Sequence, residues 1–121
     1  MTLPQFRATL TSPEPPIDLG PGLAALWHDG RGDWEAAHRV AQDIDTSEGA
    51  WIHAYLHRKE GDPGNAAYWY RRAGKPVPSV TLDAEWDAIV AQSLEPFQRP
   101  TAARQWQLIE TCVNQRPQAP T

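Results

Sequence analysis

Cysteine is almost absent from this sequence. Among its 121 residues there is a single one, Cys112. No disulfide can therefore form within the chain, and a zinc site built from cysteine ligands is excluded. Because a lack of disulfides is typical of proteins in a reducing compartment, we expect a cytoplasmic protein.

Long apolar runs are also lacking. No stretch approaches the roughly 20 apolar residues that a membrane-spanning helix needs, and MTLPQFRATL at the N-terminus contains no apolar signal-peptide core. Prolines are concentrated in residues 1–20, where they remove hydrogen-bond donors and restrict the backbone. We therefore expect an extended N-terminal segment over residues 1–20 and no membrane association.

The chain has no excess of positive charge. Its net charge is −4, which argues against nucleic-acid binding. Acidic side chains dominate residues 29–48 and basic ones dominate residues 58–75, and such a surface attracts an oppositely charged partner or favours a homo-oligomer. We expect a protein or peptide partner, with Arg71, Arg72 and Lys75 as the anion- or partner-binding face. The alternative is two solvated helix faces with no partner.

Recognisable catalytic motifs are missing as well. There is no glycine-rich phosphate loop, no nucleophile elbow and no cysteine with a positioned base. The stretch HAYLH at residues 53–57 lacks the glutamate that zinc proteases place beside their first histidine. The sequence names no reaction, and an enzyme is not favoured.

What the sequence does contain is helical periodicity along most of its length. Asp33, Thr46 or Ser47, Asp62 and Thr81 are good N-cap residues. Helices are predicted over residues 23–30, 34–44, 48–60, 64–73, 82–94 and 101–113. No strand pattern competes, so we predict an all-α protein. It would have one α-helical, repeat-like domain over residues 21–114 and a flexible tail over residues 115–121.

Two parts of the chain repeat each other at an offset of 29 residues. His28, Gly32, Asp33 and Ala37 align without a gap on His57, Gly61, Asp62 and Ala66. Each unit reads as a helix, a Gly-Asp turn and a second helix. Such hairpins cannot bury their apolar faces alone, so we expect them to stack.

The stretch EGDPGNAAYWYRRAGKP resembles the second helix of a tetratricopeptide or Sel1-like repeat. The matching residues are Gly61, Asp62, Ala66, Trp69, Tyr70, Arg72 and Ala73. The upstream unit departs from that pattern, because Val40 and Ala41 stand where aromatic residues are expected. Residues 20–94 also resemble a group of small bacterial proteins of unassigned function. These resemblances imply a bacterial origin and two stacked tetratricopeptide- or Sel1-like helical hairpins, followed by two C-terminal helices.

The histidines form the most distinctive pattern. His53, His57 and Glu60 share one face of a helix, His28 occupies the position equivalent to His57, and His38 follows Ala37. All four histidines are predicted to point into helix–helix seams or a concave groove. We expect hydrogen bonds to Asp29, to tyrosines (Tyr55, Tyr68 and Tyr70) or to backbone groups. His53 and His57 should lie near His28 or Tyr70, with no cofactor.

Two alternatives remain open for these histidines. His28, His53, His57 and Glu60 could bind a divalent metal such as zinc. Neutral imidazoles could instead line a groove for a small molecule or a peptide.

The function that follows is a helical-repeat interaction module. It would bind a protein segment or a small ligand in a concave groove lined by His, Trp and Tyr. The residues predicted to contact that ligand are Trp27, His28, Trp51, His53, His57 and Arg58. The alternative is a His/carboxylate metalloprotein, which could be a small hydrolase.

Overall fold

The computed structural model describes residues 1–94 and shows an all-helical chain. This part contains α1 (Leu3–Ala8), a 3-10 helix η1 (Thr9–Thr11), α2 (Pro21–Gly30), α3 (Trp34–Ala41), α4 (Ser47–Glu60), α5 (Pro63–Ala73) and α6 (Leu82–Leu94), and no strand. The all-α class is confirmed. The helix expected at residues 101–113 and the tail at 115–121 lie outside the described residues. No helix described here has both the length and the apolar character to span a membrane.

The two predicted Gly-Asp turns have the same structure. Gly32 and Gly61 adopt left-handed backbone angles, with φ of 85° and 92°, which glycine reaches without a Cβ clash. The next residues, Asp33 and Asp62, donate their backbone N–H groups to the carbonyls of His28 and His57 at 2.9 and 3.0 Å. Their carboxylates then cap α3 and α5. The equivalence of the two turns is confirmed.

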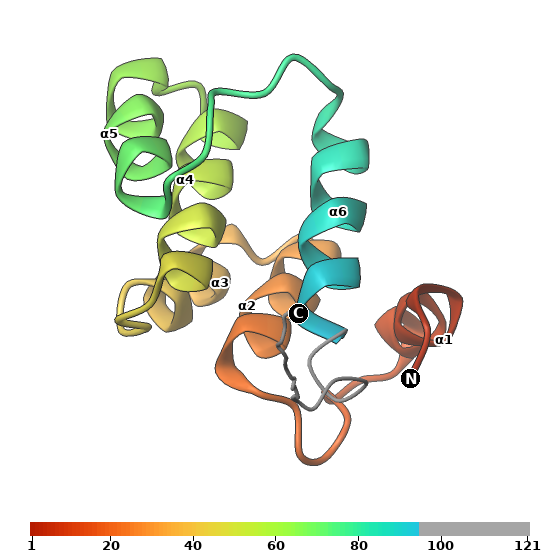
Figure 1. Cartoon of the computed structure of the whole chain (residues 1–121). Coiled ribbons are helices and arrows are strands. Elements are labelled where there is room, and N and C mark those ends of the chain that lie inside the picture. The colour runs from red at the N-terminus through yellow and green to blue at the C-terminus, as the bar shows by residue number, and fades with distance from the viewer. Residues whose placement is uncertain (95–121) are drawn as a thin grey trace, which may run out of the picture.

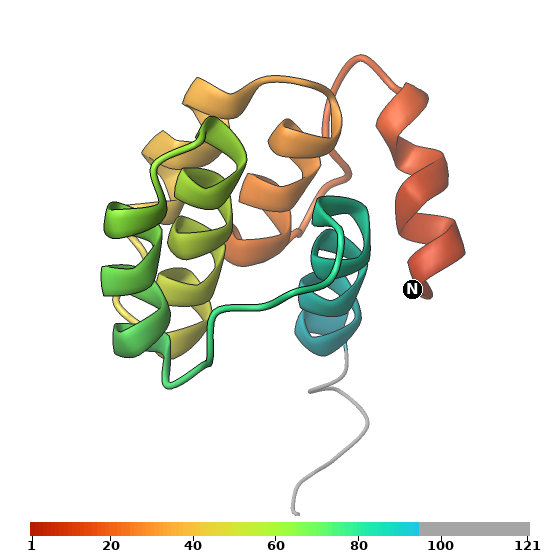
Figure 2. The ribbon, with the colours of Figure 1, turned by 90° about the horizontal axis from the view of Figure 1, so that it is seen from above.

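Helix α4 lies at the centre of the fold (Figures 1 and 2). It contacts α5, α3, α2 and α6, while α6 also packs on α2 and α1 packs on α6. All residues of α4 from Gly49 to His57 are buried, as expected for a helix surrounded on every side. Ala37, Ala54 and Ala66 are almost fully covered, so the hairpin helices approach closely there.

The N-terminal segment differs from the prediction. Residues 1–20 were expected to be extended, but residues 3–11 form α1 and η1. Thr2 and Gln5 form a reciprocal capping box, and Pro4 stands in the first turn, where a missing N–H costs no hydrogen bond. Phe6 is fully buried and packs on Trp86 with ring centroids 5.8 Å apart. The segment is therefore part of the core, because a large aromatic side chain is buried by docking on α6.

We predict that Asp62→Ala will lower the free energy of unfolding by about 0.5–2 kcal/mol, since the carboxylate accepts a hydrogen bond from the backbone N–H of Asn65 at 3.2 Å. Urea denaturation monitored by circular dichroism measures the change. Asp62→Asn is the matched control, because its amide oxygen can accept the same bond. Equal losses in the two variants would contradict a capping role.

Candidate functional site

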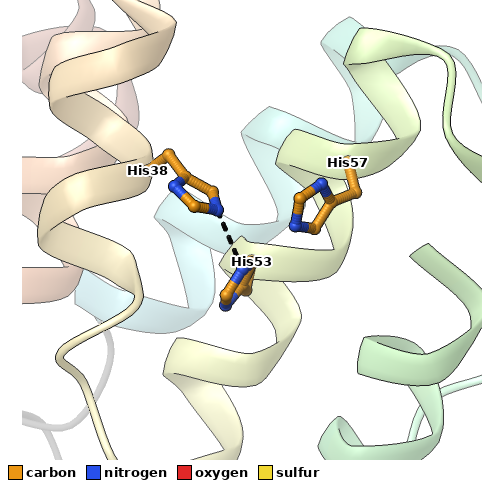
Figure 3. A group of neighbouring side chains, drawn as sticks. All are labelled: His38, His53 and His57. Carbon is orange, nitrogen blue, oxygen red and sulfur yellow. Dashed lines mark hydrogen bonds between the residues drawn. The ribbon is translucent and has the colours of Figure 1, made fainter. Parts of the chain in front are cut away.

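Three histidines converge in the seam between α3 and α4 (Figure 3). His38 comes from α3, and His53 and His57 come from successive turns of α4. The Nε2 atoms of His38 and His53 lie 3.0 Å apart, and one ring nitrogen from each of the three residues lies within 4.8 Å of the others. We call His38, His53 and His57 the histidine cluster.

Two tryptophans hold the rings of the cluster. Trp34, one turn before His38, stacks on the His38 ring with centroids 4.9 Å apart and planes at 10°. Its indole N–H donates to the carbonyl of Leu56 at 2.8 Å, which anchors it to α4. Trp69 of α5 stacks on His53 at 3.9 Å and 15°. The cluster is thus enclosed by flat apolar surfaces that restrict rotation of two of its rings.

The imidazoles of His38 and His53 favour the neutral form. Burial, followed by the repulsion of His38 and His57, lowers the pKa of His53 to about 4. Burial and the neighbouring His57 lower the pKa of His38 as well, although Glu60 opposes this. A hydrogen bond between two Nε2 atoms requires one nitrogen to donate its N–H and the other to offer its lone pair. At neutral pH His38 and His53 are therefore uncharged.

A carboxylate orients the third ring. Nδ1 of His57 lies 2.7 Å from Oε2 of Glu60, three residues further along α4. A carboxylate accepts a hydrogen bond from the N–H at Nδ1, so the lone pair of a neutral His57 is at Nε2. Because Nδ1 is engaged with Glu60, Nε2 is the atom that His57 can direct toward the other two rings.

Two hollows adjoin the cluster. The larger, of about 430 Å³, is lined by Ala41, Gln42, Ile44, Asp45, Thr46, Ser47, Gly49, Ala50, His53, Trp69 and Arg72. The smaller, of about 270 Å³, is lined by Trp34, Glu35, His38, Arg39 and Gln42. One imidazole of the cluster thus contributes to the wall of each hollow.

The histidines do not have the partners predicted for them. His28 belongs to neither group of potential metal ligands found among residues 1–94, and its ring contact is an edge-on one with the adjacent Trp27. Asp29 instead accepts hydrogen bonds from Tyr55 at 2.7 Å and Lys59 at 2.8 Å. His53 and His57 are buried, as predicted. Their hydrogen bonds go to His38 and Glu60 rather than to His28, Tyr70 or Asp29, so the predicted partners are wrong.

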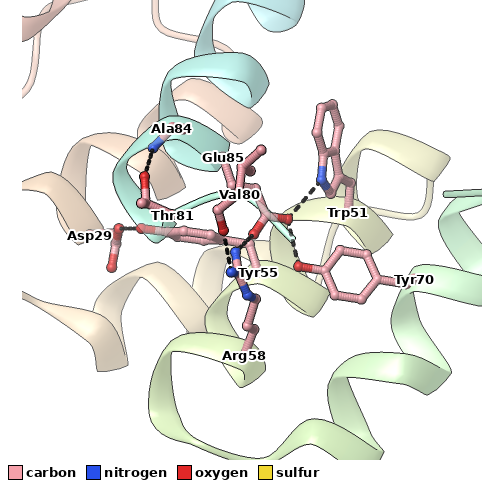
Figure 4. A network of polar contacts seen from close by, with 9 residues as sticks. All are labelled: Asp29, Trp51, Tyr55, Arg58, Tyr70, Val80, Thr81, Ala84 and Glu85. Atoms are coloured by element: carbon pink, nitrogen blue, oxygen red, sulfur yellow. Dashed lines mark hydrogen bonds and ion pairs between the residues drawn. The ribbon is translucent and has the colours of Figure 1, made fainter. Parts of the chain in front are cut away.

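Trp51 and Arg58, which were predicted to bind ligand, belong to a buried network around Glu85 (Figure 4). The Glu85 carboxylate is 2% exposed and accepts hydrogen bonds from Trp51 at 3.1 Å, Arg58 at 2.7 Å and Tyr70 at 2.5 Å. Burial and this carboxylate raise the pKa of Tyr70, so its hydroxyl stays protonated as a donor. Trp27 donates to the carbonyl of Thr9. Of the six predicted contact residues, only His53 and His57 lie in the cluster.

The predicted ligand-contact and metal sets did not include His38, Trp34 or Trp69, although His38 was expected in a seam or groove. One signal for them was present, since Trp34 and His38 stand four apart on one helix, as His53 and His57 do. Spacing alone does not say which helix faces which.

The residues described here include two groups that could hold a metal ion. One is the histidine cluster, and the other consists of His57, Glu60 and Asp62. The second group has two exposed acids, and the carboxylate of Asp62 already caps α5. The set proposed from the sequence, with His28, does not come together, and His38 takes its place.

The predicted basic face is at the end of α5. Arg71 and Arg72 are exposed, and no ion pair within residues 1–94 involves either of them or Lys75. Arg72 lies over the rings of Tyr68 and Trp69 at 5.8 and 5.2 Å, and Lys75 lies over Trp51 at 4.0 Å. All three cations therefore lie over aromatic rings rather than in ion pairs of residues 1–94.

We predict that lowering the pH destabilises the metal-free fold through His53. Its pKa is about 4 in the folded chain against a usual value of 6.5, so the unfolded chain binds the proton first as the pH falls. The stabilisation is complete above about pH 6.5 and is lost toward about pH 4. Urea unfolding with a chelator present should give a lower free energy at about pH 5 than at about pH 7.

His53→Gln should reduce this pH dependence without abolishing it, because the pKa of His38 is lowered too. His28→Gln is the matched control and should retain the dependence of the unmodified chain. The same slope in His53→Gln as in the unmodified chain would contradict a neutral, buried His53.

Comparisons of the chain with protein-family models, with curated proteins and with solved structures give no match. The resemblance to tetratricopeptide and Sel1-like repeats therefore stays a prediction from the residues. What the protein does has to be inferred from the histidine cluster and the hollows beside it.

Proposed function

We propose that this protein is a helical binding module that holds a small ligand, or one side chain of a protein segment, in the larger hollow beside the histidine cluster. The observation that supports this most is the hollow of about 430 Å³. It lies between the first turns of α4 and the C-terminal half of α5, beside the segment that joins α3 to α4. That volume falls within the range of about 300–1,000 Å³ typical of small-molecule sites.

The lining of the hollow suits a ligand with an apolar body and a polar group. Ala41, Ile44 and Ala50 contribute apolar surface, and Trp69 contributes a flat aromatic ring. Small-molecule sites commonly combine such walls with a few polar groups that orient the ligand. Arg72, His53 and the hydroxyls of Thr46 and Ser47 are of that kind.

The repeat family, the origin and the partner proposed for this module are those that the sequence predicts. The hairpins α2–α3 and α4–α5 would be a short tetratricopeptide- or Sel1-like array in a bacterial, cytoplasmic protein. A partner protein with an acidic segment would meet the exposed arginines of α5, Arg71 and Arg72. A second copy of the chain, through its acidic region, is one such partner.

We predict that filling the hollow abolishes ligand binding. Ser47 is exposed and lines the hollow at the first position of α4, so Ser47→Tyr should block the space without disturbing the core. A fragment library with aromatic and carboxylate members, screened by amide NMR, should perturb signals of residues around the hollow in the unmodified chain. The same fragments should leave Ser47→Tyr unperturbed.

Ser79→Tyr is the matched control, because Ser79 is exposed in the segment between α5 and α6, outside the lining of the hollow. It should bind the fragments as the unmodified chain does. Fragments that perturb another part of the surface, or that still bind Ser47→Tyr, would contradict the proposal.

A separate prediction concerns the basic face. If it recognises acidic segments, an oligoglutamate peptide should bind, and its affinity should fall as salt is added, since screening acts over about 10 Å at 0.1 M. Reversal of both charges, Arg71→Glu with Arg72→Glu, should abolish binding. The free energy of unfolding should change by less than about 1 kcal/mol, because exposed charges contribute little to stability.

Arg39→Glu provides the control for net charge, since Arg39 is exposed on α3. Fluorescence anisotropy of a labelled peptide measures all three proteins. Binding that is independent of salt, or that Arg39→Glu weakens as strongly as the double reversal, would exclude this face.

A further inference from the structure

We infer that His38, His53 and His57 form a binding site for a divalent transition-metal ion of the zinc class. The inference is independent of the proposed ligand hollow, because it rests on the cluster alone. It also differs from the metal set suggested by the sequence, in which His28 stood where the structure places His38.

The spacing of the nitrogens is the first argument. Zinc binds histidine nitrogens at about 2.0–2.1 Å, so two ligands of a tetrahedral ion lie about 3.3 Å apart. The Nε2 atoms of His38 and His53 are already 3.0 Å apart, and a nitrogen of His57 lies within 4.8 Å of both. The His57 nitrogen is the one that has to move closer, from at most 4.8 Å to about 3.3 Å from the other two.

The hydrogen bond between His38 and His53 is the second argument. Their Nε2 atoms, 3.0 Å apart, can share a proton only if one ring donates its N–H and the other offers its lone pair, so both nitrogens already point into the same space. On metal binding the donating ring would carry its proton on Nδ1 instead, and both Nε2 lone pairs would face the ion.

The surroundings of the rings are the third argument. Ligating histidines commonly donate their second N–H to a carboxylate, which orients the ring and increases its basicity. Glu60 stands in that position behind His57, 2.7 Å from Nδ1. Trp34 and Trp69 hold the other two rings by stacking. The site is therefore largely formed before the metal arrives.

An ordinary buried histidine accounts less well for the cluster. A histidine in a helix seam is usually satisfied by a carboxylate, a hydroxyl or a backbone group. Within residues 1–94, His38 and His53 instead form a hydrogen bond with each other. Three imidazoles this close to one another repel each other when protonated. A bound cation removes this disadvantage, because it uses the lone pairs that the rings direct at one another.

Three protein nitrogens leave one position of a tetrahedral ion for water or another ligand, as in catalytic zinc sites rather than closed structural ones. His53 also lines the larger hollow and His38 the smaller one. A small molecule in either hollow would therefore lie beside a residue of the metal site.

The test uses the full chain without an affinity tag, with Zn²⁺ and Co²⁺ as probes. We expect one equivalent of Zn²⁺ to bind, measured by competition with a chromogenic chelator. Co²⁺ should give the intense visible absorption of a four- or five-coordinate ion. His38→Gln should lower Zn²⁺ affinity by more than about 100-fold, and Glu60→Gln by about 10–100-fold, since Glu60 only orients a ligand.

The controls are residues of the same types outside the cluster. His28→Gln should keep the affinity of the unmodified chain, and Glu14→Gln, at an exposed acid before α2, should do the same. Ser47→Tyr should also bind Zn²⁺ unchanged, which separates failure of the metal site from failure of the hollow. Binding that survives in His38→Gln, or is lost in His28→Gln, would overturn the inference.

A measurement on the unmodified chain covers the case in which a variant does not fold. Imidazole ¹⁵N NMR resolves the four histidines, and Zn²⁺ should shift the rings of His38, His53 and His57 while leaving that of His28 in place. Absence of these shifts at one equivalent of Zn²⁺, or equal shifts of all four rings, would show that the cluster is not a metal site.

Discussion

The carboxylate of Glu85 is the group on which the arrangement of α4, α5 and α6 depends. It is almost completely buried, and it accepts hydrogen bonds from Trp51 and Arg58 of α4 and from Tyr70 of α5. A buried charge without partners costs several kcal/mol. All three donors must therefore be in place when α6 packs, and this requirement limits the positions that α6 can adopt against the second hairpin.

The residues of α4 that bind the buried carboxylates and the histidines of α4 lie on opposite faces of the helix. Trp51, Tyr55 and Arg58 are spaced by four and three residues, and so are His53, His57 and Glu60. The two sets are offset by two residues, about 200° around a helix of 3.6 residues per turn. One face of α4 is held by the buried carboxylates, through Glu85 and the pair of Asp29 with Tyr55. The opposite face meets α3 and α5 with the histidine cluster.

The hydrogen-bond partners of the buried polar groups distinguish those that hold the helices together from those that are candidates for binding. Glu85 and Asp29 accept hydrogen bonds from charged, hydroxyl and indole donors, so both carboxylates are matched by their partners. Among residues 1–94, His38 and His53 form their hydrogen bond with each other, between two stacked tryptophans and beside two hollows. The proposals of a ligand and of a metal ion therefore concern the histidine cluster rather than the buried carboxylates.

The sequence by itself determined the features that depend on neighbours along the chain. The helices within residues 21–94, the caps at Asp33 and Asp62 and the left-handed glycines before them follow from local hydrogen bonding and backbone sterics. Only the tertiary structure decided that α1 docks through Phe6, and that His38 rather than His28 joins His53 and His57. The 29-residue offset makes His28 and His57 equivalent within their hairpins, but equivalence places them at corresponding positions and not in contact. The helix that faces the histidines of α4 is set by how the hairpins pack, and no spacing within one helix encodes that choice.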